Sequence, residues 1–442
     1  MRRLSLRSAQ SAGRFFARGI FFLIVAAAAA SQPVTLYDAD AEHLWNRLHR
    51  VLFIRTSPSG MEFGHDAVNP LLRPRSTHLL TGTSREQAVA ILREFLEKNG
   101  EKLVADATRR ALLQRGLWAA FDWAAEPSDA HRPPGLEPAA RELSELLGRV
   151  LARLTLTAEE VRALPDTYRA AVASKKFPTA FDEAAPDTPF LPPDLLDPAG
   201  GWVCLGEQVR TQGRTFLKLV PRHVDEFSSS VFAVFIWMPE GRAATKAWLG
   251  RLNNFATPWV VDGRRVSIHR DLPQFPHGTQ LALLRCAMVI GPEGALVPTR
   301  IVESLQVRRY HAPADKPGEA RQVMQEFVLT RKGADSDAPV SLRSLGKDEK
   351  GFREFSDLAD AFEPQGPGRW EEPHLDVVLK TCIGCHHDPG VRSFNTYTRT
   401  FGPQLTVPPP LVETTMEERE QASIYWKQTR YDWGLLRGLM MR

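Results

Sequence analysis

The feature that most constrains this chain is a five-residue pattern close to its C-terminus. The pattern consists of Cys382, Ile383, Gly384, Cys385 and His386. Two thiols at this spacing can each form a thioether with one of two neighbouring vinyl groups of a porphyrin. The imidazole that follows then lies under the ring, where it can bind the iron. The pattern is therefore typical of covalent haem attachment.

This segment resembles the haem-binding segment of c-type cytochromes. The resemblance implies one haem c per chain, attached to Cys382 and Cys385, with His386 as the proximal iron ligand. It covers the motif and roughly the last 75 residues, which is the size of a small haem module. It implies electron transfer as the function and a small all-α module over residues 346–442.

Two other kinds of site can be built from the same thiols and imidazole. A structural zinc site needs a fourth ligand, usually from a second pair such as C-x-x-C or H-x-x-x-H, and the sequence contains no such pair. A redox C-x-x-C of the thioredoxin type follows a strand in a βαβ unit. Here Leu375, Val378 and Leu379 have helical spacing and predict a helix before the motif. Both alternatives are therefore less favoured than haem.

The second axial ligand of the iron is commonly Met or His in an electron carrier. Met416 is the first candidate, because Pro408, Pro409 and Pro410 before it would stiffen a loop that holds its thioether. Met440 is the second candidate, although a methionine is more often a core residue. An open sixth position would instead make the protein a haem enzyme or a gas sensor. A third alternative is a non-redox binding protein with structural haem.

Residues 1–30 have the pattern of a signal peptide. Five arginines without any acidic residue precede an apolar run, and Ala28, Ala29 and Ala30 before Ser31 suit a signal peptidase. The apolar run is about a dozen residues long, whereas a membrane helix needs roughly 20. Because c-type haem is attached after export, the signal and the motif predict the same location. We expect a periplasmic or otherwise exported protein, tethered to the membrane if the signal is not cleaved.

The formal charge of the chain depends on this segment. The whole chain carries +4, but the five arginines of residues 1–30 leave the remainder at −1. A nearly neutral chain does not favour nucleic-acid binding. The sequence also contains no P-loop, no G-x-S-x-G, no H-E-x-x-H and only one C-x-x-C-H. We expect an unidentified redox partner protein and no transmembrane segment after signal cleavage.

Apolar spacing predicts a helical region over residues 31–175. Leu44, Trp45 and Leu48 recur at helical intervals, and Thr157 with Glu160 forms a capping box. His43 and His49 lie in this region without a ligand-spaced partner, so we expect them to be surface or core histidines. Residues 176–200 contain many prolines and are interpreted as a connector between two regions.

Residues 201–345 are predicted to form a β-rich domain. Residues 229–237 form a β-branched and aromatic run, and 280–290 with 296–307 flank a short loop, as in a hairpin. Strands without alternating helices favour an antiparallel sheet and therefore an α+β chain. Cys204 and Cys286 fall in this region, either as a disulfide or as buried thiols.

The C-terminal part is predicted to contain a tether followed by a helix. Residues 331–370 are polar and are interpreted as a loop that leads into the haem module. A helix is predicted from near Thr415 towards Leu439. Residues 44–48 and 272–279 resemble segments of uncharacterised secreted bacterial proteins that end in a haem motif, and this resemblance implies no activity.

Overall fold

Helices occupy the first part of the chain, as predicted. The computed structural model describes residues 36–126, 132–211, 214–218, 229–263, 265–311, 322–331, 340–352, 359–364, 373, 375–386, 390–393 and 409–441. These residues belong to one unit, 34–442, and the predicted signal peptide lies outside them. The helices of the first part are α1 (Leu44–Phe53), α2 (Gly82–Glu97), α3 (Ala107–Ala125), α4 (Glu137–Arg153), α5 (Ala158–Ala163) and α6 (Thr167–Ala173).

The sequence pattern of these helices agrees with their burial. In α1, Leu44, Trp45 and Leu48 are all buried, so the apolar stripe faces the core. The capping box of Thr157 and Glu160 opens α5, as predicted. Helix α3 is buried around most of its circumference, because it packs between α4, α12 and the sheet. Two short strands, β1 (Arg55–Thr56) and β2 (Glu62–Phe63), form a small ladder after α1.

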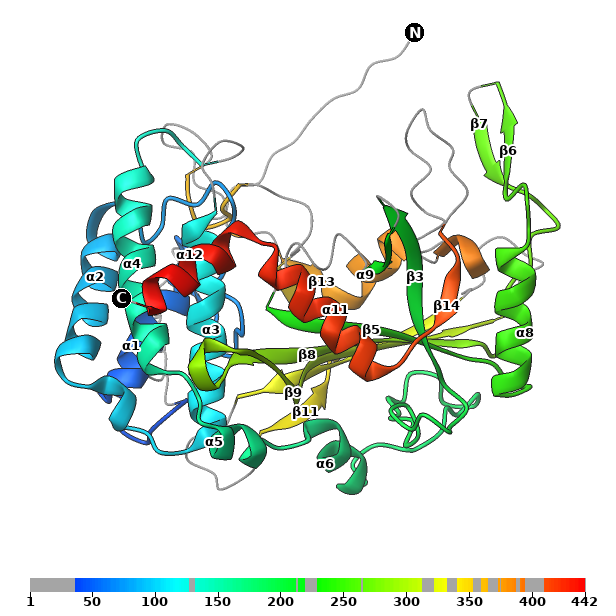
Figure 1. The fold of residues 1–442 in the computed structure, drawn as a ribbon, viewed down its shortest axis with the longest axis horizontal. Helices are drawn as coiled ribbons and strands as arrows, with labels where there is room; N and C mark the ends of the chain where they lie inside the picture. Colours follow the sequence, from blue (N-terminus) through cyan, green and yellow to red (C-terminus); the bar gives the residue numbers. More distant parts are fainter. Residues whose placement is uncertain are drawn as a thin grey trace, which may run out of the picture. The chain divides into compact units, whose positions relative to one another are not determined.

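An eight-stranded antiparallel sheet forms the second part (Figure 1). The predicted hairpin of β8 and β9 is confirmed and lies near the middle of this sheet. In spatial order the strands are β11 (Ser341–Ser344), β10 (Gln322–Thr330), β9 (Leu296–Tyr310), β8 (Gln280–Ile290), β5 (Ser230–Trp237), β3 (Val203–Thr211) and β14 (Leu411–Glu413), with β4 (Arg214–Lys218) paired to β3. The fold class is therefore α+β, as predicted.

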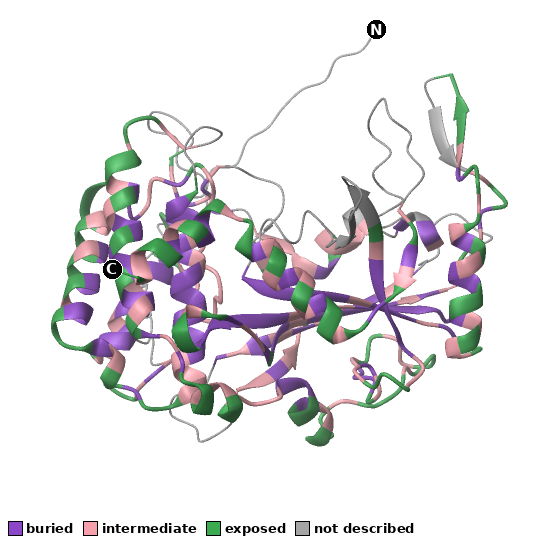
Figure 2. Ribbon diagram, in the orientation of Figure 1, coloured by how far each residue is buried: buried purple, intermediate pink, exposed green. Residues whose placement is uncertain are grey.

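The helical part and the sheet share one hydrophobic core. Buried side chains from α1 to α4 and from β5, β8 and β9 belong to the same cluster, and the strands are buried along most of their length (Figure 2). An ion pair of 2.8 Å between Arg115 on α3 and Glu303 on β9 crosses this interface, with both side chains 1% exposed. The Pro-rich segment 176–200 contains no helix or strand, yet its Phe190, Leu191 and Leu195 are buried in the same core.

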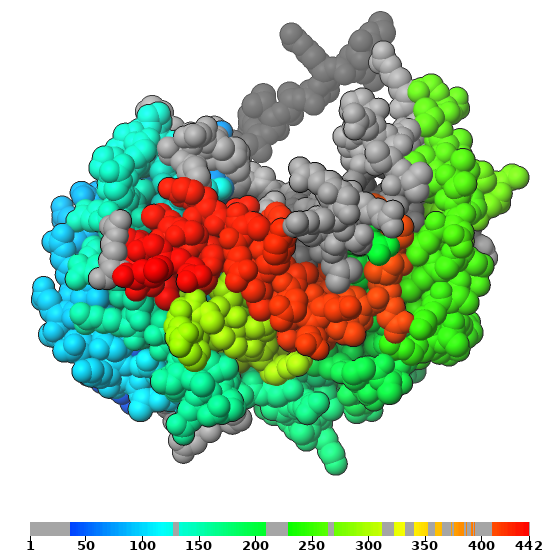
Figure 3. Space-filling model, in the orientation of Figure 1, coloured from blue at the N-terminus to red at the C-terminus, as the bar shows by residue number. Residues whose placement is uncertain are grey.

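The C-terminal segment lies across both parts. Strand β14 extends the main sheet beside β3, α11 (Met416–Gln428) packs on β5, and α12 (Tyr431–Met440) packs on α3 and α4. Figure 3 shows this orange to red segment running over the surface from the sheet to the helices. Helix α11 begins next to Thr415, as expected, and Thr415 caps it with a capping box, but the predicted single helix is two helices that meet at Thr429 and Arg430.

A separate all-α module at the C-terminus is not seen in the described residues. The described part of 346–442 includes β14 and a two-stranded ladder of β12 (Lys350–Phe352) with β13 (Leu375–Val377). The region predicted as a tether also contains β11, which pairs with β10. Further elements are α8 (Arg242–Asn253) and a hairpin of β6 (Trp259–Asp262) with β7 (Arg265–Ile268). None of the described helices combines the length and the apolar character that a membrane-spanning helix requires.

Candidate functional site

The predicted haem-attachment motif lies on a short helix, α9 (Val378–His386). Leu375, which was expected in this helix, belongs instead to β13, because residues 375–377 pair with 350–352. The helix starts at Val378, whose N–H donates to the carbonyl of Glu349 at 3.0 Å. Positions 382, 385 and 386 have i, i+3, i+4 spacing, which puts them on one face of a helix. The two cysteines and the histidine can therefore serve the same flat ligand.

The ring of His386 is oriented by a backbone carbonyl. Its Nδ1 lies 2.7 Å from the carbonyl oxygen of Ser393. A carbonyl oxygen can only accept a hydrogen bond, so Nδ1 carries the proton and the lone pair of the neutral ring is on Nε2. Histidines that bind metals usually have this arrangement, in which the second ring nitrogen donates to a carbonyl and fixes the tautomer.

The turn after α9 supplies this carbonyl. Ser393 ends the short helix η3 (Gly390–Ser393), and its hydroxyl donates to the carbonyl of Gly390 at 2.8 Å. The same hydroxyl lies 2.7 Å from the hydroxyl of Tyr310, the last residue of β9. The side chain of Gln322, the first residue of β10, donates to the carbonyl of His386. The ends of two sheet strands thus hold the motif in place.

The segment 272–279 also contacts this turn. The N–H of Val391 donates to the side-chain oxygen of Gln274 at 3.3 Å. Val391 also belongs to a small apolar cluster with Phe275 and Tyr310. Gly390 has a positive φ of 55°, and a Cβ there would lie 2.4 Å from the same Gln274 oxygen, so the position favours glycine. The segment 272–279 therefore packs against the turn that follows the motif.

The described thiol of the motif fits thioether formation. Cys382 is partly exposed and forms no disulfide, and its Sγ lies 3.9 Å from a carboxylate oxygen of Glu326 on β10. The backbone of Cys385 is described, but its side chain is not. A thioredoxin-type site is disfavoured, because β13 belongs to an antiparallel pair and not to a βαβ unit. Among the described side chains, neither Cys382 nor His386 belongs to a group of three metal ligands.

The structure places both methionine candidates for the distal ligand against the main core. Met416 is the first residue of α11 and packs, partly buried, on the core shared by the helices and the sheet. Met440 packs on the same core, with its Cε beside Gly294. By contrast, the elements in close contact with α9 are β10, β12, β13 and η3. Pro408 lies outside the described residues, and a distal ligand therefore stays a prediction.

The two other cysteines are separate thiols. Cys204 on β3 and Cys286 on β8 are both buried and free, and β5 lies between their strands. Burial raises the pKa of Cys204 to about 12 and also raises the pKa of Cys286. The buried-thiol alternative is therefore correct, and the disulfide alternative is wrong.

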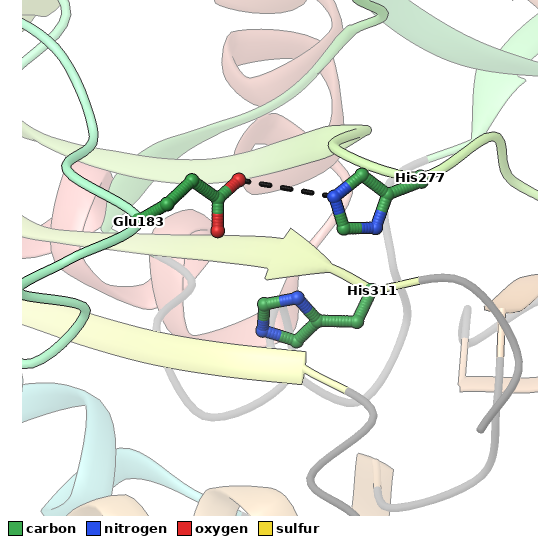
Figure 4. A group of neighbouring side chains, drawn as sticks. All are labelled: Glu183, His277 and His311. Carbon is green, nitrogen blue, oxygen red and sulfur yellow. Dashed lines mark ion pairs between the residues drawn. The ribbon is translucent and has the colours of Figure 1, made fainter.

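A group of three side chains that sequence reasoning missed lies beside the segment 272–279. Glu183, His277 and His311 bring their ligand atoms within 4.8 Å of one another (Figure 4). The guanidinium of Arg309 lowers the pKa of Glu183, and burial lowers the pKa of His311. The three residues come from three distant parts of the chain, so no local spacing in the sequence indicated them.

A cavity of about 750 Å³ lies elsewhere, between α1 and α2. Its wall contains Arg47, which pairs with Glu94 at 2.9 Å, and Arg55, which pairs with the buried Asp360 at 2.9 Å. His78 also lines it, and burial lowers the pKa of this histidine to about 4. None of the described side chains of α9 lines the cavity, so the cavity does not belong to the motif.

No protein-family model matches this chain, and searches of curated proteins and of solved structures gave no match.

Proposed function

We propose that this chain is an exported mono-haem c-type cytochrome-like protein that transfers electrons to or from a partner protein. Its haem would be bound covalently through Cys382 and Cys385, with His386 as an axial iron ligand. The observation that carries this proposal is the contact between Nδ1 of His386 and the carbonyl of Ser393. A histidine that served only as a polar surface group would not need a dedicated carbonyl to select its tautomer.

The chain would contribute attachment, orientation and a fixed ligand. Each thiol would form one thioether, and the i, i+3, i+4 spacing directs both towards one side of α9. Gln322 and Ser393 would keep His386 at a constant angle, since they bond its backbone carbonyl and its ring. Bound haem would supply a one-electron couple between the ferrous and ferric forms. The haem-binding unit we propose is α9 together with the ends of β9 and β10, within the larger predicted module of 346–442.

A reduced-minus-oxidised absorption spectrum tests the proposal. The full chain would be produced in a bacterial host that matures c-type cytochromes, and spectra would be recorded with and without CO. We expect low-spin bands that appear on reduction and do not change with CO. His386→Ala should lose these bands, whereas His269→Ala, a change at a partly exposed histidine, should keep them. A haem that cannot be reduced would contradict electron transfer.

One observation favours a second candidate, a haem enzyme or gas sensor with an open iron position. Met416 and Met440 both pack on the main core, so the described structure assigns no methionine to the site. In this second case the ferrous protein should bind CO rapidly, and the same spectra would show it. Unchanged low-spin bands in a Met416→Leu variant would exclude Met416 as the distal ligand, and only CO binding would then favour the open position.

A further inference from the structure

Two histidines and a glutamate meet at the end of the β8–β9 hairpin. Nε2 of His277 lies 3.8 Å from Oε1 of Glu183, and the rings of His277 and His311 are 5.8 Å apart between centroids. Figure 4 shows the three side chains gathered at one place, with Glu183 directed towards His277. Glu183 comes from the Pro-rich segment, His277 precedes β8, and His311 follows β9.

Backbone hydrogen bonds fix the two histidines as neighbours. The N–H of Gly278 donates to the carbonyl of Tyr310 at 2.8 Å, and the N–H of Tyr310 donates to Thr279 at 2.8 Å. These bonds continue the antiparallel ladder of β8 and β9 by one more pair. Residues 277 and 311 therefore leave the hairpin side by side, and their positions do not depend on side-chain packing alone.

The side chain of Arg309 holds Glu183 next to the two histidines. Its guanidinium bonds Oε1 of Glu183 and donates to the carbonyl of Gly278 at 3.1 Å. The guanidinium also lies over the ring of Phe181, 4.5 Å from the centroid. Arg309 and His277 both contact Oε1, and a carboxylate has two oxygens. Metal binding through Oε2 therefore does not require the ion pair to break, and Arg309 would act as an outer partner that orients the carboxylate.

The donor set and its spacing suit a transition-metal ion. Two imidazole nitrogens and one carboxylate oxygen form a donor set that zinc sites use, with water in the fourth position. Donors that bind one zinc at about 2.1 Å can be no more than about 4.2 Å apart. The present limit of 4.8 Å is close to this value. The side chains of His277 and Glu183 are 57% and 53% exposed, so small rotations can close the remaining gap.

We propose that Glu183, His277 and His311 bind a divalent transition-metal ion of the zinc type. The metal would fasten the Pro-rich segment 176–200 to the end of the β8–β9 hairpin, next to the residues that hold α9. This proposal does not depend on haem attachment, because none of its ligands belongs to the C-x-x-C-H motif.

Isothermal titration of the full chain with Zn²⁺ tests this proposal. We expect one site in the wild type, and a loss of affinity of at least ~10-fold in His277→Ala/His311→Ala, since even the loss of an outer partner of a metal ligand has this effect. The matched control is His269→Ala, because within the described part of the chain Asp271, at 3.9 Å, is the only carboxylate that pairs with His269. This control should bind Zn²⁺ as the wild type does.

Two further variants separate this site from other sources of zinc binding. Cys382→Ala/Cys385→Ala should keep the Zn²⁺ site, and loss of zinc in that variant would assign the binding to the thiols and overturn the proposal. Glu183→Gln can still bond Arg309, so the fold should be kept while Zn²⁺ affinity falls. Circular dichroism would check the fold of each variant. Unchanged Zn²⁺ affinity in a folded double-histidine variant would also overturn the proposal.

Discussion

The rings of His386 and His49 both contact a backbone carbonyl, but only His49 is buried in the core. Nε2 of His49 lies 3.3 Å from the carbonyl of Gly64, and its ring stacks on Phe53 with centroids 4.8 Å apart. The residue is 0% exposed, and burial lowers its pKa to about 3. His49 is therefore neutral in the folded protein over the physiological pH range. It is a core histidine, one of the two expected outcomes, whereas His43 is the N-cap of α1.

This buried histidine should make the folded protein sensitive to acid. The pKa of His49 is about 3 when folded and about 6.5 when unfolded, so below pH 6.5 the unfolded chain takes up a proton that the folded chain does not. The free energy of unfolding should therefore fall by about 2 kcal/mol when the pH is lowered from 6.5 to 4.5, so the folded protein becomes less stable. In His49→Gln this loss should be smaller, as urea denaturation at the two pH values would measure.

The control for this prediction is His269→Gln, at a histidine whose side chain is 32% exposed. That variant should keep the pH dependence of the wild type. Some pH dependence should remain in His49→Gln, because burial also lowers the pKa of His78 to about 4. An unchanged loss of stability in His49→Gln would show that His49 does not stay neutral in the folded state.

At the scale of elements, one buried lysine joins three helices. Lys427 near the end of α11 is 0% exposed, and its Nζ bonds Asp122 of α3 at 2.8 Å and also Asp432 of α12. The same ammonium group lies 5.1 Å from the centroid of the Trp118 ring. A charge this deeply buried is tolerated only when partners surround it. The docking of α11 and α12 on the helical part therefore depends on this group.

Lys427→Met should lower the free energy of unfolding by about 3–5 kcal/mol, because it leaves two carboxylates without their cation in the core. Lys98→Met is the matched control, since Lys98 pairs with Glu94 at the surface and is 64% exposed. The control should cost no more than about 1 kcal/mol. Equal effects of the two substitutions in urea denaturation would contradict the role assigned to Lys427.

Some of the helices and strands could be predicted from the sequence, and others could not. Strong local patterns were sufficient for α1, for the β8–β9 hairpin, for the capping box of α5 and for the start of α11. The break between α11 and α12 was missed, because Thr429 and Arg430 are neither proline nor glycine and no local breaker marks the bend. Leu375 was misplaced for a related reason, since its pairing partner Phe352 lies in a distant segment. Strand pairing between distant segments does not change the spacing of apolar residues along the chain, so this spacing cannot reveal it.

At the scale of the whole molecule, the predicted regions share one core. The segment 176–200 was interpreted as a connector because prolines exclude regular elements, and the segment indeed contains no helix or strand. The sequence did not reveal that the segment is buried against both parts. Similarly, the C-x-x-C-H motif predicted Cys382, Cys385 and His386. The residues that support them, Ser393, Gln322 and Tyr310, could be identified only from the structure, in which the ends of β9 and β10 lie beside α9.

This shared core predicts the effect of a truncation. A chain that ends at residue 345 would lose β14, Trp433 and Leu436, and these two side chains are 3% and 0% exposed. The loss of each of these two side chains would remove about 1.5–3 kcal/mol of stabilisation from apolar burial. This is a large share of a total stability of about 5–15 kcal/mol. We expect the truncated chain to lack the cooperative thermal transition of the full chain in circular dichroism. A cooperative transition at the same temperature would mean that 346–442 is an independent module.

The central claim is that a porphyrin is covalently bound to α9, and one measurement on intact protein tests it most directly. The chain would be purified from a host that matures c-type cytochromes, its pyridine haemochrome spectrum recorded, and the peptide that contains Cys382 and Cys385 weighed by mass spectrometry. We predict a spectrum of the c type and a peptide heavier by one haem. A colourless protein whose peptide has only the mass of its amino acids would contradict the proposed function.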